Sequence, residues 1–287
     1  MLRALNNTGR SVNAIGLGAM PLSIQGRPDE AQAIAVIREF VESGGDFIDT
    51  ANVYCLDDTD IGHNERLIHR ALTRIGKRNA VAIATKGGLR RPKGAWTVDA
   101  RPEWLRSSCE QSLKDLACGE IFLYQLHAVD ANVAFLDSLA ELVRLKQEGK
   151  ILHIGLSNVS VGQLERALRH TVIASVQNRC NPFAKKDLAN GIVKLCADKG
   201  VAYIPYSPVG GGNGYKRLAA HELFRRLATK YGVSPYCIAL AWLLACGQHI
   251  IPIPGASRPS SVKDSALAPT VKLEQNDIKQ IDRLADV

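Results

Sequence analysis

Apolar residues recur along the chain in two patterns that alternate with each other. From about Glu30 to Ser43 they fall on one side of a helix, as Ile34, Ile37 and Val41 show. Shortly afterwards, the apolar run Phe47-Ile48 follows a pair of glycines and ends in an acid, which is typical of a buried strand that opens into a loop. The same alternation continues along the chain and predicts a parallel sheet covered by helices.

The expected elements begin with a short N-terminal β-hairpin, built from residues 2–10 and the segment from Val12. Strands are then predicted to end at residues 15–18 and to cover residues 47–49, 81–85, 121–126, 152–156, 174–177, 202–206 and 249–253. Helices are predicted at residues 30–43, 64–75, 102–117, 132–148, 160–169, 187–199, 218–231, 234–246, 258–267 and 274–285. Eight strands that alternate with helices favour a closed (β/α)8 TIM barrel, an α/β fold, over an open doubly wound sheet. We expect residues 1–287 to form one domain.

Composition narrows the class of protein. The chain has 287 residues and a formal net charge of +8, but its basic residues are scattered and are not interleaved with aromatic residues. Nucleic acid is therefore not an expected partner, whereas the positive charge would attract a phosphorylated cofactor or an anionic substrate. The N-terminus lacks the apolar region of a signal peptide, and the longest apolar run spans about ten residues. These features predict a cytoplasmic protein that does not cross a membrane.

The cysteines point to a reducing compartment. There are seven of them, with no Cys-x-x-Cys pair and no His/Cys spacing typical of zinc, so we expect free thiols and no bound metal. Cys196, Cys237 and Cys246 lie in apolar helical patterns and are expected in the core. Cys55 is adjacent to Tyr54, where a reactive thiol is a possibility that the sequence leaves open.

Four polar residues are predicted at or just beyond the ends of adjacent strands: Asp49, Tyr54, Lys86 and His127. Each has an ordinary explanation alone, but in a β/α barrel the carboxyl ends of the strands form the active-site edge. A tyrosine titrates near ~10, and a neighbouring ammonium that lowered its pKa by about 3 would contribute about 4 kcal/mol. With Asp49 holding Lys86 in place and His127 orienting a carbonyl oxygen, these residues predict proton transfer to that oxygen.

Together with further motifs along the chain, these four residues make the sequence resemble the aldo-keto reductase superfamily over nearly its whole length. The matching segments are Gly16-Leu-Gly18, Asp49-Thr-Ala-Asn-Val-Tyr54, Gly62-x-Asn64-Glu65, Thr85-Lys86, Leu126-His127, Ile154-Gly-Leu-Ser157-Asn158, Val176-Gln177-Asn178, Tyr206-Ser207-Pro208 and Ile253-Pro254-Gly255-Ala-Ser257-Arg258.

The resemblance implies a nicotinamide cofactor, NADPH (NADP), held on the barrel without a Rossmann domain. Ser157, Asn158 and Gln177 match the residues that hydrogen-bond its carboxamide, and Tyr206 matches the aromatic residue that stacks on its ring. The remaining matches are Ser207 and the loop from Gly210 to Gly214 for the pyrophosphate, and Ser257 and Arg258 for the 2′-phosphate. For the glycine loop, a flexible surface turn remains an alternative.

Two parts of the chain depart from the family pattern. Where the family often has Glu-Asn in contact with adenine, this chain has Asp264-Ser265, and the shorter serine puts that contact in question. The segment after the last strand is brief, so the substrate pocket is expected to be formed by Met20, Cys55 and Trp96.

The expected function is NADPH-dependent reduction of an aldehyde or ketone to an alcohol, with the proton supplied by Tyr54. One alternative is physiological oxidation of an alcohol by the same residues, and Ser157-Asn158-Val159 gives a loose similarity to reductases that act on pyridoxal. Another is an NADPH-binding regulatory subunit with slow turnover. A metal-dependent barrel hydrolase is not expected, because this sequence contains no His-x-His pair to bind the metal. The expected partner is a small-molecule carbonyl substrate, and the protein is expected to be a monomer or weak homo-oligomer.

Overall fold

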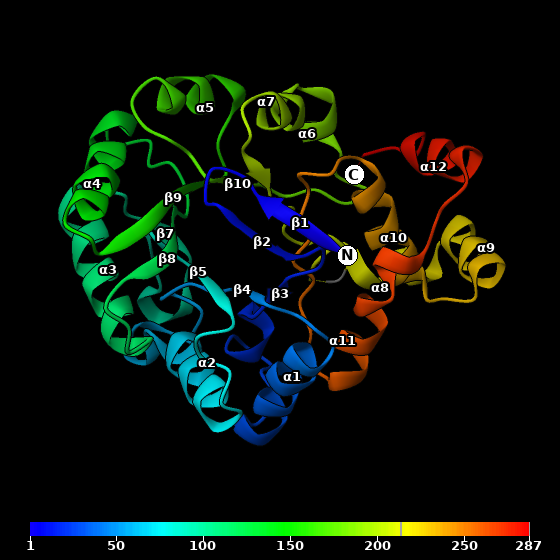
Figure 1. Ribbon diagram of the computed structural model, residues 1–287, viewed down its shortest axis with the longest axis horizontal. Helices are drawn as coiled ribbons and strands as arrows, with labels where there is room; N and C mark the ends of the chain where they lie inside the picture. Colours follow the sequence, from blue (N-terminus) through cyan, green and yellow to red (C-terminus); the bar gives the residue numbers. More distant parts are fainter. Residues whose placement is uncertain (213, 287) are drawn as a thin grey trace.

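A curled parallel sheet surrounded by helices forms the body of the molecule (Figure 1). The computed structural model describes residues 1–212 and 214–286. Within these residues the sheet has seven strands in the order β11-β10-β9-β8-β5-β4-β3, and each neighbouring pair is parallel. The strands are β3 Leu17–Gly18, β4 Phe47–Asp49, β5 Ala82–Gly87, β8 Ile121–Leu126, β9 Ile151–Ser157, β10 Ser175–Gln177 and β11 Ala202–Tyr203.

Residues 249–255 occupy the position of the eighth strand and close the sheet into a barrel. The Ile251 amide donates to the Tyr203 carbonyl of β11 at 2.9 Å. On the other side, the Gly16 and Gly18 amides donate to the carbonyls of Pro252 and Pro254 at 2.9 and 3.0 Å. These bonds confirm the predicted (β/α)8 barrel. The segment is not a regular strand, because proline has no N–H to complete the ladder.

The predicted N-terminal hairpin is also confirmed. Its strands, β1 Leu2–Leu5 and β2 Arg10–Asn13, pair antiparallel and lie across the barrel in Figure 1. Leu5 and Val12 are fully buried and pack with the apolar side chains inside the barrel. The hairpin is therefore the floor of the barrel interior, at the end opposite the carboxyl ends of the strands.

The helices are α1 Glu30–Glu42, α2 His63–Arg74, α3 Pro102–Asp115, α4 Phe135–Gln147, α5 Val161–Leu168, α6 Lys186–Ala189, α7 Ile192–Asp198, α8 Gly214–Ala220, α9 Glu222–Tyr231, α10 Pro235–Ala245, α11 Pro259–Ala266 and α12 Gln275–Asp282. Local sequence explains several of their starts. Asp29 caps α1, Ser160 and Gln163 form a capping box at α5, and Ser234 caps α10 by accepting from the amide of the third helical residue.

Two predicted helices are each divided in the structure. The helix expected at residues 187–199 becomes α6 and α7, because Gly191 between them adopts a φ of 93° that ends one helix before the next begins. The helix expected at residues 218–231 becomes α8 and α9, and His221 caps the second. A further antiparallel pair, β6 Leu89–Arg90 and β7 Thr97–Val98, was not predicted and extends the loop after β5.

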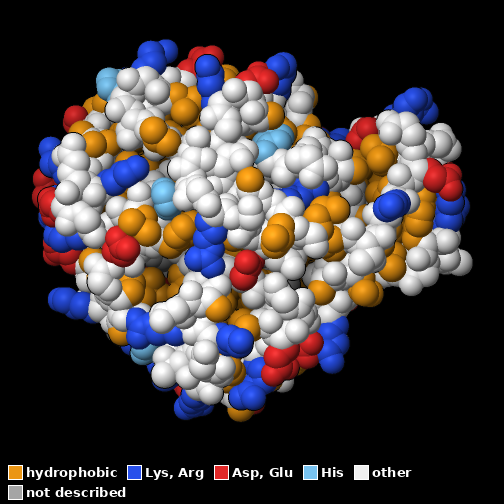
Figure 2. All heavy atoms as spheres, in the orientation of Figure 1, with side chains coloured by type: hydrophobic (Ala, Val, Ile, Leu, Met, Phe, Trp, Pro, Cys, Tyr) orange, Lys and Arg blue, Asp and Glu red, His pale blue; other side chains and the backbone are white. Residues whose placement is uncertain are grey.

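The surface carries mixed charge. On the face shown in Figure 2, lysine and arginine side chains are interspersed with acidic and uncharged ones. In the described part of the chain, no helix has the length and apolar character needed to cross a membrane.

Candidate active site

The carboxyl ends of neighbouring strands bring the predicted catalytic side chains together. Asp49 is the last residue of β4, Lys86 is the penultimate residue of β5, and His127 directly follows β8. β5 pairs with both β4 and β8. Because all three strands are parallel, these ends lie side by side, and the loop after β4 carries Tyr54 to the same edge.

Lys86 is the centre of this group. Its ammonium donates to Asp49 Oδ1 at 2.5 Å, to the Thr50 carbonyl at 2.8 Å and to the Tyr54 hydroxyl at 2.9 Å. The side chain is fully buried, so the three donors of the ammonium are all used inside the protein. Burial lowers the pKa of Lys86, but Asp49 and Tyr54 raise it by more, and the net pKa lies above the ordinary value. Lys86 therefore stays charged.

Tyr54 is a buried, neutral acid. Burial raises its pKa, and the opposing effect of Lys86, although in the predicted direction, is smaller. The expectation that Lys86 would lower the pKa overall is therefore wrong, because the net pKa of Tyr54 lies above the ordinary value. The hydroxyl retains its proton at neutral pH and can donate it to an acceptor.

His127 lies beside Tyr54, with ring centroids 5.8 Å apart and an interplanar angle of 82°. Burial and the charge of Lys86 hold the pKa of His127 well below its ordinary value, so the imidazole is neutral. The Asn158 amide donates to the His127 carbonyl at 2.9 Å and fixes the backbone there. A neutral imidazole has one N–H, which is available to orient a carbonyl oxygen.

The residues predicted to hold a carboxamide and a flat ring also lie together. Asn158 donates to Ser157 Oγ at 3.1 Å and accepts from the Tyr206 hydroxyl at 3.0 Å. The backbone N–H of Asn158 donates to the Gln177 carbonyl at 3.1 Å. The φ of Asn158 is 58°, which turns the chain at the end of β9. The Gln177 side chain instead donates to Asp49 Oδ2 at 2.7 Å.

The predicted pyrophosphate loop has a left-handed backbone. Ser207, Gly210 and Gly211 have φ values of 50°, 103° and 60°. A Cβ at Gly210 would lie 2.5 Å from the Gly214 carbonyl carbon, so a larger residue could not keep this turn. Asn213 of the predicted loop lies outside the described residues.

The predicted 2′-phosphate residues lie at the start of α11. Ser257 and Arg258 are exposed, and the Gln32 side chain fixes the Ser257 carbonyl at 2.7 Å. In the part of the chain that the structure describes, no acidic side chain pairs with Arg258, although Lys263 on the same helix pairs with Glu39. The Arg258 guanidinium is thus available for an anion.

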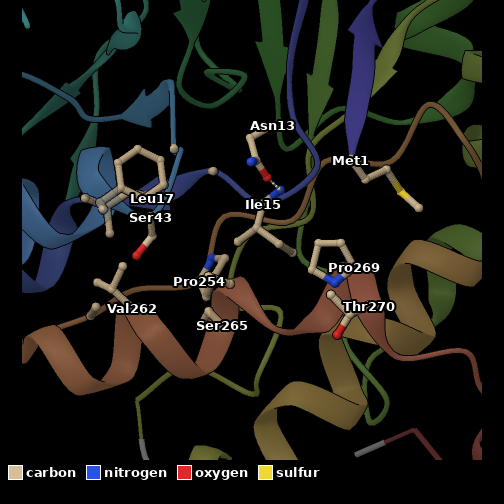
Figure 3. A pocket seen from close by; sticks show the side chains of 15 residues that line it. Met1, Asn13, Ile15, Leu17, Ser43, Pro254, Val262, Ser265, Pro269 and Thr270 are labelled. Carbon is tan, nitrogen blue, oxygen red and sulfur yellow. Dashed lines mark hydrogen bonds between the residues drawn. The ribbon is translucent and has the colours of Figure 1, made fainter.

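Asp264 and Ser265 face different surroundings. Asp264 accepts from the Ser234 hydroxyl at 2.6 Å, at the start of α10. Ser265 lines a cavity of about 210 Å³ between α11 and β3, together with Met1, Asn13 and Ile15 from the hairpin side (Figure 3). The predicted adenine contact of this pair stays a prediction.

Two of the three predicted pocket residues lie beside Tyr54, and the thiol of the third turns into its own loop. Met20 packs against the cluster that contains Tyr54, and the Trp96 ring lies edge-on to it with centroids 6.3 Å apart. Trp96 is 47% exposed and can form a wall. Cys55 is fully buried, and its Sγ lies 3.3 and 3.2 Å from the Val53 and Asp57 carbonyl oxygens of its own loop, either of which can accept its one S–H. Burial raises the pKa of this thiol to about 11, which disfavours the nucleophilic thiolate at neutral pH.

Two residues of this edge were missed from the sequence. Gln125, fully buried on β8, donates to Asp49 Oδ2 at 3.1 Å. Its place two residues before His127, on the same face of the strand, was a usable signal. Arg91 lies 3.9 Å from the Trp96 ring and donates to the carbonyls of Gly94 and Cys55, which ties two loops together. No sequence pattern marked it.

The fold is a β/α barrel, and the carboxyl ends of its strands bring a buried aspartate, lysine, tyrosine and histidine together. Comparison with known proteins identifies the family. Residues 14–286 match the model of the Aldo/keto reductase family. A soybean (Glycine max) protein, probable aldo-keto reductase 1, is 33% identical over 96% of this chain and 86% of its own length. The chain belongs to the aldo/keto reductase family, which makes it an oxidoreductase of a family that reduces carbonyl groups with nicotinamide cofactors.

Solved structures agree with the fold. The glycerol dehydrogenase AKR11B4 from Gluconobacter oxydans superposes with a TM-score of 0.84 at 27% identity, covering 98% of this chain and 94% of that one. The holo form of aldo-keto reductase AKR11C1 from Bacillus halodurans superposes with a TM-score of 0.81 at 24% identity, covering 100% of this chain and 97% of that one.

In the described residues, no cluster of three or more His, Cys, Asp or Glu side chains could hold a metal ion.

Proposed function

We propose that this protein reduces an aldehyde or ketone to an alcohol with NADPH, and that Tyr54 donates the proton. The observation that carries the proposal is the 2.9 Å contact between the Tyr54 hydroxyl and the buried ammonium of Lys86, which Asp49 in turn holds. A neutral tyrosine beside a fixed positive charge can lose its proton to a substrate oxygen, because the tyrosinate that remains is stabilised by that charge.

The neighbouring groups divide the remaining tasks. The neutral imidazole of His127 donates a hydrogen bond to the substrate oxygen and polarises the carbonyl group. Lys86 and Asp49 stay inside the protein and keep the Tyr54 hydroxyl in place. Trp96 and Met20 flank Tyr54 and would exclude water from the reacting carbonyl.

The site fits a phosphorylated nicotinamide cofactor. The turn at Ser207, Gly210 and Gly211 is left-handed, and its two glycines carry no side chain, so a pyrophosphate could approach the backbone closely there. Arg258 is exposed and has no acidic partner in the described residues, and an arginine fork suits a 2′-phosphate. Ser157 and Asn158 would hold the carboxamide, and Tyr206 would stack on the ring. When bound, the reduced cofactor supplies the hydride.

The name of one similar structure, a glycerol dehydrogenase, supports a small alcohol and its carbonyl product as the substrate pair. The same residues serve both directions of such a reaction. We propose reduction as the direction: the protonated hydroxyl of Tyr54 is the form that gives a proton to a carbonyl oxygen, whereas oxidation of an alcohol would start from the tyrosinate.

The test is steady-state oxidation of NADPH with a panel of aldehydes, ketones and pyridoxal, with NADH in parallel. Tyr54→Phe should lower kcat by ~10²–10⁴-fold and keep the affinity for NADPH. Tyr124→Phe is the matched control, because Tyr124 is also buried but its hydroxyl bonds to the Leu105 carbonyl outside the site. Turnover by Tyr54→Phe equal to that of the control would remove Tyr54 as the acid, and tight NADPH binding without turnover on any carbonyl would favour a regulatory protein.

A further inference from the structure

Asp49 uses its two carboxylate oxygens for different purposes. Oδ1 accepts from Lys86 at 2.5 Å. Oδ2 faces away from the lysine and accepts from two side-chain amides, Gln177 at 2.7 Å and Gln125 at 3.1 Å. All three residues that surround the carboxylate are at most 2% exposed, so water does not supply these bonds.

The orientation of Gln125 is fixed at its other end. Its side-chain oxygen accepts from Ser175 Oγ at 3.4 Å and from Gln177 Nε2 at 3.3 Å. If the amide were turned over, this oxygen would face the carboxylate oxygen of Asp49, and its NH₂ would face the NH₂ of Gln177. Both contacts would be repulsive, so only one orientation satisfies the group.

We propose that Gln125 is a positioning residue of the active site: together with Gln177 it holds Asp49 Oδ2, so that Oδ1 stays on the Lys86 ammonium and the ammonium stays on Tyr54. The inference rests on the proposed role of Tyr54 as the acid. Lys86 has no spare donor with which to follow a displaced carboxylate, since its other two bonds go to Thr50 and Tyr54. If Asp49 rotated and Lys86 followed it, Lys86 would therefore lose its hydrogen bond to the Tyr54 hydroxyl.

The same arrangement links the site to the cofactor side of the barrel. Gln177 gives its NH₂ to Asp49 and Gln125. In the described residues no donor reaches its side-chain oxygen, which leaves that oxygen for the NH₂ of a carboxamide. A carboxamide bound to that oxygen would influence the orientation of Asp49 through the side chain of Gln177.

The electrostatic sign follows from the groups that face Tyr54. Lys86 on β5 lowers the pKa of Tyr54, whereas Asp49 on β4 and Tyr206 beyond β11 raise it, and His127 beside it is neutral. The amide N–H groups on Asp49 offset part of its negative field. Removing one of them leaves more of the negative charge of Asp49 acting on Tyr54, and a Lys86 that follows a displaced Asp49 loses its contact with Tyr54. Both changes make the tyrosinate less stable.

The experiment compares Gln125→Met and Gln125→Glu with Leu123→Met, a control on the same strand whose buried side chain packs in the barrel interior. Gln125→Met should lower kcat by ~3–30-fold with KM within about twofold. A second readout is the ¹³C chemical shift of the Tyr54 ring carbon that bears the hydroxyl, in protein without cofactor. Ionisation of Tyr54 should begin about half a pH unit higher in Gln125→Met than in wild type.

Gln125→Glu keeps the shape of the side chain and guards against a folding defect in Gln125→Met. A protonated carboxyl can still donate to Asp49, so its turnover should approach wild type at acidic pH and fall as the carboxyl ionises. A purely structural role would not give this pH dependence.

Two results would overturn the inference: Gln125 variants that match Leu123→Met in kcat, or an unchanged onset of Tyr54 ionisation in Gln125→Met. Failure of the proposed function is a separate outcome. Wild-type protein without carbonyl turnover would reject that function, while the ionisation of Tyr54 would still decide whether Gln125 positions Asp49 and Lys86.

Discussion

The buried pair of Asp49 and Lys86 allows a prediction about stability that does not depend on the substrate. Lys86→Met removes the positive charge and leaves a side chain of similar length, so little cavity forms. Asp49, 2% exposed, would then keep a charge that only two amide donors compensate. Removing one partner of a buried ion pair typically costs about 3–5 kcal/mol, and we expect a loss of that size in the free energy of unfolding.

A second change separates charge from packing. Asp49→Asn combined with Lys86→Met removes both charges, and the Asn carbonyl can still accept from Gln125 and Gln177. The combined variant should recover at least about 2 kcal/mol of the loss, although the Thr50 carbonyl still lacks its donor. The two residues are in contact, so their effects should not add.

Urea unfolding, analysed by linear extrapolation, measures both quantities. Lys194→Met is the control: Lys194 is 77% exposed and pairs with Asp198 on the surface, so its loss should cost less than about 1 kcal/mol. If the combined variant were as unstable as Lys86→Met alone, the cost would come from packing rather than from the unpaired charge, and the reasoning would be refuted.

The remaining predictions concern the cofactor and pH. Arg258→Ala should weaken binding of NADPH about tenfold or more and change binding of NADH little, as calorimetry can measure, with Lys263→Ala on the same helix as the control; equal losses for both nucleotides would reject a phosphate role. Burial raises the pKa of Glu65 to about 7, so the folded protein favours the protonated carboxyl, and stability is lost as the pH rises from the ordinary carboxyl range through 7. Glu65→Gln should remove this dependence, gaining ~3 kcal/mol relative to wild type between about pH 4 and pH 8 in urea unfolding, and parallel pH profiles for the two proteins would contradict it.

The barrel and the meeting of Asp49, Lys86 and His127 could be predicted from the sequence for one reason. The residues at the carboxyl ends of adjacent parallel strands must lie at one edge, whatever the details of packing. Periodicity therefore places the strand ends, and the types of side chain there suggest the chemistry. Tyr54 follows because its loop starts directly after Asp49.

Other features depend on conformations that spacing does not encode. The break between α6 and α7 needs a left-handed residue at Gly191, which a helical apolar pattern continues across. Cys55 adjoins Tyr54 in sequence, but its thiol turns into its own loop. Gln125 reads as one polar residue in a buried strand, and only the opposing Asp49 shows what it binds.

The seam at Pro252 and Pro254 has a consequence for how the chain reaches its closed form. Before the barrel closes, the last strand position is an open sheet edge, the kind of surface on which other chains can build. Prolines at alternate residues deprive this edge of N–H groups on the side that later meets β3, whose own amides supply the bonds there. Pro252 and Pro254 reduce the number of hydrogen bonds in the closed barrel. For the same reason, they make the edge of the open sheet a poorer partner for the strands of other protein molecules.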